Sequence, residues 1–99
     1  MPRIPEETQK KIFLALLREV RERQGVSQGG LAERLTGFGQ PEVSKVERGV
    51  RRLDVLELRA WVKALATPLP EFTAELESRL ARAERAEARL RRRANAETA

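Results

Sequence analysis

The sequence of 99 residues contains no cysteine, no histidine and no tyrosine. These absences exclude disulfides, thiolate or imidazole metal sites, and Cys or His nucleophiles and bases. Catalysis would have to rest on carboxylates, lysine or hydroxyl groups, yet no phosphate-binding loop, metal cluster or paired carboxylates in an apolar setting can be recognised. We therefore expect neither an enzyme nor a bound cofactor or metal.

Long apolar runs are also absent. The longest covers residues 12–17, whereas crossing a bilayer takes roughly 20 apolar residues. The N-terminus shows no charged-then-apolar leader. We expect one small cytoplasmic domain with no membrane partner, because this length is too short for a multidomain enzyme.

Basic residues exceed acidic ones, with 20 Lys+Arg against 15 Asp+Glu, a net charge of +5 and a pI near 10.7. The excess lies on both sides of an acidic segment over residues 64–78. This charge favours an anionic partner. Arginine outnumbers lysine 16 to 4, which either suits phosphate recognition or reflects a GC-rich genome.

Apolar residues at helical spacing predict four helices before residue 68. The first covers residues 5–24 and ends at Gly25, after which Ser27 can cap a second helix over 28–35. Two glycines in 36–39 interrupt the pattern, and a third helix follows over 40–48. Asp54 and Glu57 then form a capping-box-like start for a fourth. Since no segment has the alternation of a strand, the fold class is all-α.

After residue 69 the composition shifts to Ala, Arg and Glu, which predicts an extended C-terminal helix to about residue 94 and a frayed tail over 95–99. Arg79 and Arg93 interrupt its apolar seam, so a long coiled coil is poorly specified. Its outer face suits salt bridges. The residues expected to form a dimer or partner surface are Leu69, Phe72, Leu76 and Leu80.

The second and third helices with the turn between them have the arrangement of a helix-turn-helix, whose second helix enters the major groove of DNA. The sequence here resembles the lambda-repressor and Cro-like family, often called Xre-type regulators. The stretches that carry the resemblance are Gly25-Val26-Ser27-Gln28, Leu31-Ala32-Glu33-Arg34-Leu35, Val43-Ser44-Lys45-Val46-Glu47-Arg48-Gly49 and Arg51-Arg52-Leu53-Asp54-Val55.

The resemblance covers roughly residues 14–72 and implies a compact domain of four to five helices that binds double-stranded DNA. We expect this domain over 5–72 and a separate C-terminal helical segment over 69–99. Family members usually act as dimers, so the resemblance implies a repressor-like regulator that binds a palindromic operator as a homodimer. The C-terminal helix could also take a protein partner.

This chain departs from the commonest family pattern at three places. The segment between Leu35 and Val43 is one residue longer, Gly29 and Gly30 replace acidic or amide residues, and Pro41 stands where many members place a polar base reader. Pro41 can offer only an apolar contact, for instance to a thymine methyl group.

Two glutamines are the leading contact candidates. Gln28, beside Ser27 at a helix N-terminus, is placed where helix-end amides can meet a backbone phosphate, and the resemblance gives it that role. Gln40 can donate to and accept from adenine at once. The alternative for both is an ordinary solvated side chain.

The other candidates lie along and after the third helix. Glu42 could accept from cytosine N4, but the helix dipole also favours an acidic residue in a first turn, and we favour this structural role. Ser44 and Lys45 can reach a base edge or a phosphate. The phosphate clamps would be Arg48, Arg51 and Arg52, unless this cluster is merely solvated.

Glu47 resembles the family's acidic residue that pairs with an arginine of the first helix, here Arg21. We expect this ion pair to be structural. A second hypothesis belongs to another class, in which the same fold serves as a protein-interaction adaptor or antitoxin-like module with weak or nonspecific DNA binding. It draws support from Gly29, Gly30, Pro41 and Glu42, which are not optimised for DNA.

Overall fold

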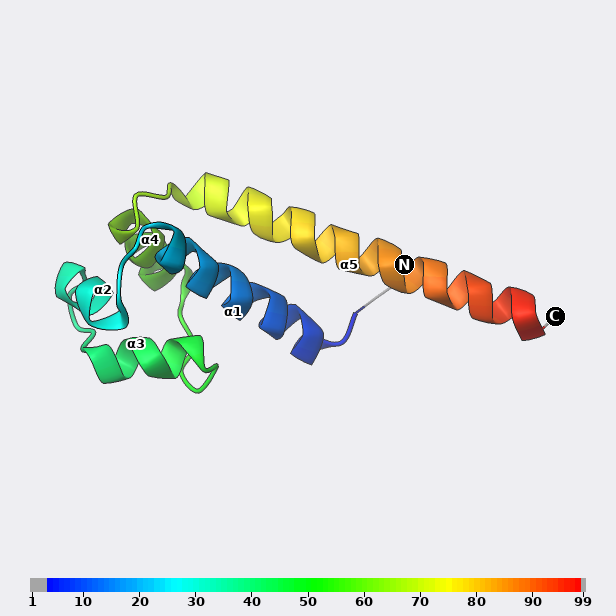
Figure 1. Ribbon diagram of the computed structural model, residues 1–99, viewed down its shortest axis with the longest axis horizontal. Coiled ribbons are helices and arrows are strands. Elements are labelled where there is room, and N and C mark those ends of the chain that lie inside the picture. The colour runs from blue at the N-terminus through cyan, green and yellow to red at the C-terminus, as the bar shows by residue number, and fades with distance from the viewer. Residues whose placement is uncertain (1–3, 99) are drawn as a thin grey trace.

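The computed structural model describes residues 4–98, which form five helices (Figure 1). They are α1 (Glu6–Arg23), α2 (Gln28–Arg34), α3 (Gln40–Glu47), α4 (Val55–Ala64) and α5 (Leu69–Thr98). No strand occurs in the part of the chain that the structure describes, and the prediction of an all-α fold with an extended C-terminal helix is confirmed.

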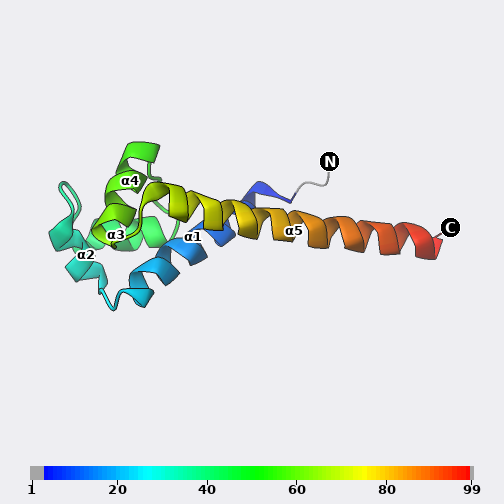
Figure 2. The same cartoon turned by 90° about the horizontal axis from the view of Figure 1, so that it is seen from above.

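The four shorter helices form a body from which α5 projects, so that the molecule measures 57 × 24 × 23 Å. Figures 1 and 2 show α5 running beside α1 and then continuing well beyond it. The prediction of a frayed tail is wrong for residues 95–98, which continue α5, and residue 99 lies outside the described residues. Across residues 4–98, no helix combines the length and the apolar character needed to span a bilayer.

One apolar core orients the helix-turn-helix. Leu31 of α2 and both Val43 and Val46 of α3 are at most 1% exposed and pack into the same cluster as Trp61 of α4. Full burial of such a side chain stabilises the fold by about 1.5 to 3 kcal/mol. Phe38, in the turn between α2 and α3, meets the Trp61 ring edge-on at 5.7 Å. The turn is therefore fixed to the core.

Two of the predicted helix caps are confirmed. The backbone N–H of Gly30 donates to Ser27 Oγ at 2.9 Å. The backbone N–H of Glu57 donates to Asp54 Oδ1 at 2.7 Å, and the N–H of Asp54 donates to Glu57 Oε1 at 3.0 Å. Each such cap is worth about 1 kcal/mol because it satisfies an amide that has no partner within its helix.

The first half of α5 is part of the body. Phe72 is 1% exposed and packs edge-on against Phe13 of α1 at 6.1 Å, while Leu69 and Leu76 lie against the core cluster. Phe72 was expected on a dimer surface, but its side chain is enclosed by its own chain. The reason is that α5 turns back along α1 and α4, and its apolar stripe fills the space between them.

An ionic cluster holds α5 against α1. Arg79 donates two hydrogen bonds to Glu19, at 2.8 and 3.1 Å, and Arg23 donates to Glu19 and to Glu75 at 3.0 and 3.1 Å. The hydrogen bonds from Arg79, followed by the one from Arg23, lower the pKa of Glu19 to about 2. Glu19 is therefore anionic throughout the range in which proteins are usually handled.

Candidate nucleic-acid interface

The turn between α2 and α3 sets the angle of the recognition helix. Gly37 adopts φ +82, a left-handed conformation that costs glycine little, and Gly39 precedes α3 in an extended conformation. The backbone N–H of Gly39 donates to Glu42 Oε2 at 2.9 Å, and Pro41 occupies the first turn of α3, where its missing N–H is not needed. The longer connection noted in the sequence is thus closed by local contacts.

A chain of hydrogen bonds runs from the core to the start of α3. Arg21 donates from Nε to Glu47 Oε2 at 2.6 Å and from Nη2 to Oε1 at 3.0 Å, and its Nη1 donates to the carbonyl of Val26 at 2.8 Å. The side chains of Arg21 and Glu47 are only 11% and 6% exposed. The hydrogen bond to Glu47 raises the pKa of Arg21 further. Charges held in this bidentate way fix α1 against α3.

The same series of hydrogen bonds extends to Gln28 and Gln40. Gln28 Nε2 donates to Glu47 Oε1 at 3.0 Å, and Gln40 Nε2 donates to Gln28 Oε1 at 2.8 Å. One N–H of each amide remains for an external acceptor, and Gln40 keeps its carbonyl oxygen. Adenine presents N7 as an acceptor and N6–H as a donor, which is the complement of the groups that Gln40 retains.

Glu42 is used within the protein. Its carboxylate accepts the Gly39 N–H at the N-terminus of α3, where the helix dipole also favours negative charge. This contact agrees with the structural role that we favoured for Glu42 over contact with cytosine.

Beyond Gln40, the outward side of α3 carries Ser44, Lys45 and Arg48. Arg48 Nε donates to Ser44 Oγ at 3.2 Å, one helical turn away, and both Lys45 and Arg48 are exposed. Val43 and Val46 point into the core between them. Gln40, Ser44 and Arg48 follow one another at four-residue steps, so a single face of α3 presents an amide, a hydroxyl and a guanidinium group.

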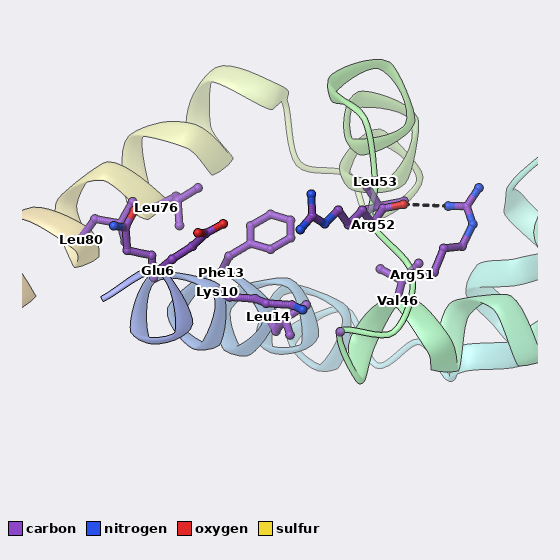
Figure 3. A pocket seen from close by; sticks show the side chains of 12 residues that line it. Glu6, Lys10, Phe13, Leu14, Val46, Arg51, Arg52, Leu53, Leu76 and Leu80 are labelled. Atoms are coloured by element: carbon purple, nitrogen blue, oxygen red, sulfur yellow. Dashed lines mark hydrogen bonds between the residues drawn. The ribbon is translucent and has the colours of Figure 1, made fainter. Parts of the chain in front are cut away.

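Arg51 and Arg52, two of the predicted phosphate contacts, lie in the loop after α3 and have different surroundings. Arg51 donates to Glu57 Oε2 at 2.8 Å, and its guanidinium carbon lies 4.5 Å from the centre of the Phe38 ring. The hydrogen bond from Arg51, followed by that from the Asp54 backbone, lowers the pKa of Glu57. Arg52 points toward Phe13 on the opposite side of the loop (Figure 3). Arg51 thus braces the turn.

Sequence reasoning missed the links that position these side chains. Gln28 and Glu47 are 19 residues apart, and Phe38 and Arg51 are 13 apart. Local periodicity carries no signal for such contacts. An aromatic residue within a Gly-rich turn, followed by arginines in the next loop, was the one available hint of a cation–π contact.

The comparisons with known proteins agree with this geometry. A family model described as helix-turn-helix matches residues 17–72, more than half of the chain and all of α2, α3 and α4. No match was found among curated proteins or among solved structures. Among the described residues, no group of three or more acidic side chains is arranged to hold a metal ion. With its match across both helices of the motif, the chain belongs to the helix-turn-helix family of lambda-repressor and Xre type, a family of DNA-binding regulators.

Proposed function

We propose that this protein is a sequence-specific transcriptional regulator that binds a palindromic operator as a homodimer and represses by occupying it. Two copies of α3 would enter successive major grooves about one helical turn, or roughly 34 Å, apart. This role requires access to chromosomal DNA, so the proposal includes a cytoplasmic location.

The pairing of Gln28 with Gln40 carries the proposal. Gln40 would read adenine through its free carbonyl and remaining N–H, while Gln28 would donate its remaining N–H to a phosphate. Because Glu47 and Arg21 hold Gln28 from the core side, both amides are ordered before DNA arrives. Ordering a side chain only on binding costs about 0.5 to 1.5 kcal/mol.

The contacts around this pair divide into two kinds. Ser44 and Lys45, one turn along α3, would reach base edges, and Pro41 would touch a thymine methyl group. Ser27 and Arg48 would meet the sugar-phosphate backbone together with Gln28. Phosphate contacts set the register of the protein on the duplex, and base contacts supply the sequence preference.

The projecting half of α5 supports the dimer. It extends beyond the body, as Figures 1 and 2 show, and Leu90 there is 61% exposed. Ala83, Ala86 and Leu90 share one side of the helix at three- and four-residue spacing. This stripe, continuing from Leu80, would pair with its equivalent in a second copy.

Replacement of Gln40 by alanine tests the base-reading role. Fluorescence anisotropy on a selected operator and on random duplex should show a loss of about 1 to 3 kcal/mol on the operator alone, with one base position relaxed. Gln24→Ala, at the exposed end of α1, is the matched control. Equal losses on both DNAs for Gln40→Ala would contradict the assignment.

The adaptor or antitoxin-like hypothesis also has one observation in its favour. Glu42 and Arg51, two of the candidate contact residues, are engaged within the protein. This hypothesis requires that the fold binds a protein through α5 while DNA binding stays weak. A salt-dependent shift of a duplex that also prefers one sequence would separate the two functions.

A further inference from the structure

A cavity of about 350 Å³ lies on the side of the body that faces the first half of α5. Its walls come from α1, the end of α3, the loop between α3 and α4, and α5, as Figure 3 shows. Small-molecule sites span roughly 300 to 1,000 Å³. The volume therefore suits a small ligand and is too small for a helix of a protein partner.

The inner surface of the cavity is apolar. Phe13 stands in its centre between α1 and α5 in Figure 3, and further apolar side chains surround it. These are Leu14, Val46, Leu53, Leu76 and Leu80. Such a lining favours a hydrocarbon or aromatic group, since burying that group removes apolar surface from water.

Two cationic side chains lie at the loop side of this surface. Lys10 packs against Gly49, where a β-carbon would approach its Cε to 3.0 Å, and the Arg52 side chain reaches toward Phe13 (Figure 3). Gly49 adopts φ +78, and its lack of a side chain leaves room for the lysine. Within residues 4–98, neither Lys10 nor Arg52 uses its charged group in a hydrogen bond or ion pair.

The lining holds two further charged side chains, one arginine and one glutamate. Arg51 also borders the cavity, but its guanidinium group is held by Glu57 and Phe38. In Figure 3 the Glu6 carboxylate extends from the start of α1 toward Phe13. The cavity thus has an apolar lining around Phe13, with the Glu6 carboxylate reaching this ring from the start of α1 and the unpaired cations Lys10 and Arg52 on the loop side.

We propose that this cavity binds a small amphipathic anion, with its apolar part on Phe13, Leu76 and Leu80 and its anionic head between Lys10 and Arg52. A guanidinium group and an ammonium group together suit a carboxylate, through charge-assisted hydrogen bonds from both. Binding here requires neither DNA nor a second copy of the chain, so it stands independently of the proposed function.

Decanoate is a suitable probe, and calorimetric titration of the full chain in the absence of DNA measures its binding. Decanoate should bind at one site per chain, whereas decylamine, a cation with the same hydrocarbon, should bind at least about tenfold more weakly. In amide NMR spectra, decanoate should shift Leu14, Gly49 and Leu80. No binding, equal binding of the two probes, or shifts confined to the projecting half of α5 would overturn the proposal.

A matched pair of double variants separates the site from general charge. Lys10→Gln with Arg52→Gln should weaken decanoate binding at least about tenfold, because the loss of even one charge-assisted contact has an effect of about this size. Lys11→Gln with Arg85→Gln removes the same charge at exposed positions outside the cavity and should leave binding unchanged. Equal effects of the two double variants would contradict the assigned site. Far-ultraviolet circular dichroism of both double variants checks that each remains helical.

Discussion

Glu47 joins α3 to both α1 and α2, so its loss should reduce stability and DNA affinity together. In Glu47→Ala, the guanidinium group of Arg21 stays in a site where its side chain is 11% exposed and keeps only the carbonyl of Val26 as an acceptor. Removal of one partner from a buried pair costs about 3 to 5 kcal/mol. The remaining contact of Arg21 places the expected loss at the lower end, about 3 kcal/mol.

This loss is large enough to measure by thermal and urea denaturation. For a domain of this size, each kcal/mol shifts the melting temperature by about 4 to 8 °C, so we expect a fall of roughly 12 to 24 °C. Trp61 is the single tryptophan and is fully buried, so its fluorescence reports global unfolding. At a temperature where the parent protein and Glu47→Ala are both folded, the variant should bind the operator more weakly by about 0.5 to 1.5 kcal/mol, because Gln28 has lost its hydrogen bond to Glu47 and must be ordered on binding.

Two variants show whether the reasoning holds. Glu22→Ala removes an ion pair with Arg18 whose side chains are 57% and 65% exposed, and it should cost less than about 1 kcal/mol. Arg21→Met combined with Glu47→Leu removes both buried charges and should recover much of the stability lost in Glu47→Ala. Unchanged melting of Glu47→Ala would refute the structural role of the pair.

Three further predictions concern the arginines, α5 and its projecting half. Arg48→Ala should weaken binding to all DNA sequences and reduce the slope of affinity against salt concentration by about one, as binding titrations at several salt concentrations would measure. Arg51→Ala should instead lower the free energy of unfolding in urea by about 0.5 to 1 kcal/mol, because its contact with the Phe38 ring is lost. The reverse pattern would contradict both roles. The depressed pKa of Glu19 contributes stability above pH 4.5 that is lost as the pH falls toward about 2, because protonation breaks its bonds with Arg79. Glu19→Gln should therefore be less stable than the parent at neutral pH and equally stable near pH 2 in urea titrations, and a constant difference would oppose this account. Leu90→Glu should convert a dimer to a monomer in sedimentation equilibrium without changing the melting of the body, and an unaltered mass would place self-association elsewhere.

Much of the fold could be predicted from local signals. Helix caps join residues that are three apart, as Ser27 to Gly30 and Asp54 to Glu57 show. The turn at Gly37 depends on the conformation of that residue itself. Such features can therefore be predicted from short stretches of sequence. The burial of Phe72 within its own chain could not be predicted in this way. Its burial depends on the direction in which α5 leaves α4, and helical periodicity gives only the face of a helix and not the neighbour that covers it.

The candidate site divides along the same line. The family resemblance supplied Arg21 with Glu47 and proposed the two glutamines, but the hydrogen bond between Gln28 and Gln40 required the folded turn. Arg51 was grouped with Arg48 and Arg52 because all three follow the recognition helix. In the structure, Arg51 and Arg52 point to opposite sides of their loop, which a charge count cannot reveal.

The most direct test of the central claim is selection of genomic DNA fragments by the purified full chain, at near-physiological salt and with competitor DNA. Competitor suppresses purely electrostatic binding, so the retained fragments report sequence preference. The account predicts enrichment of a palindrome whose half-sites are about one helical turn apart and each contain an adenine that Gln40→Ala no longer distinguishes. Retention of fragments without a shared motif, or no retention, would contradict it.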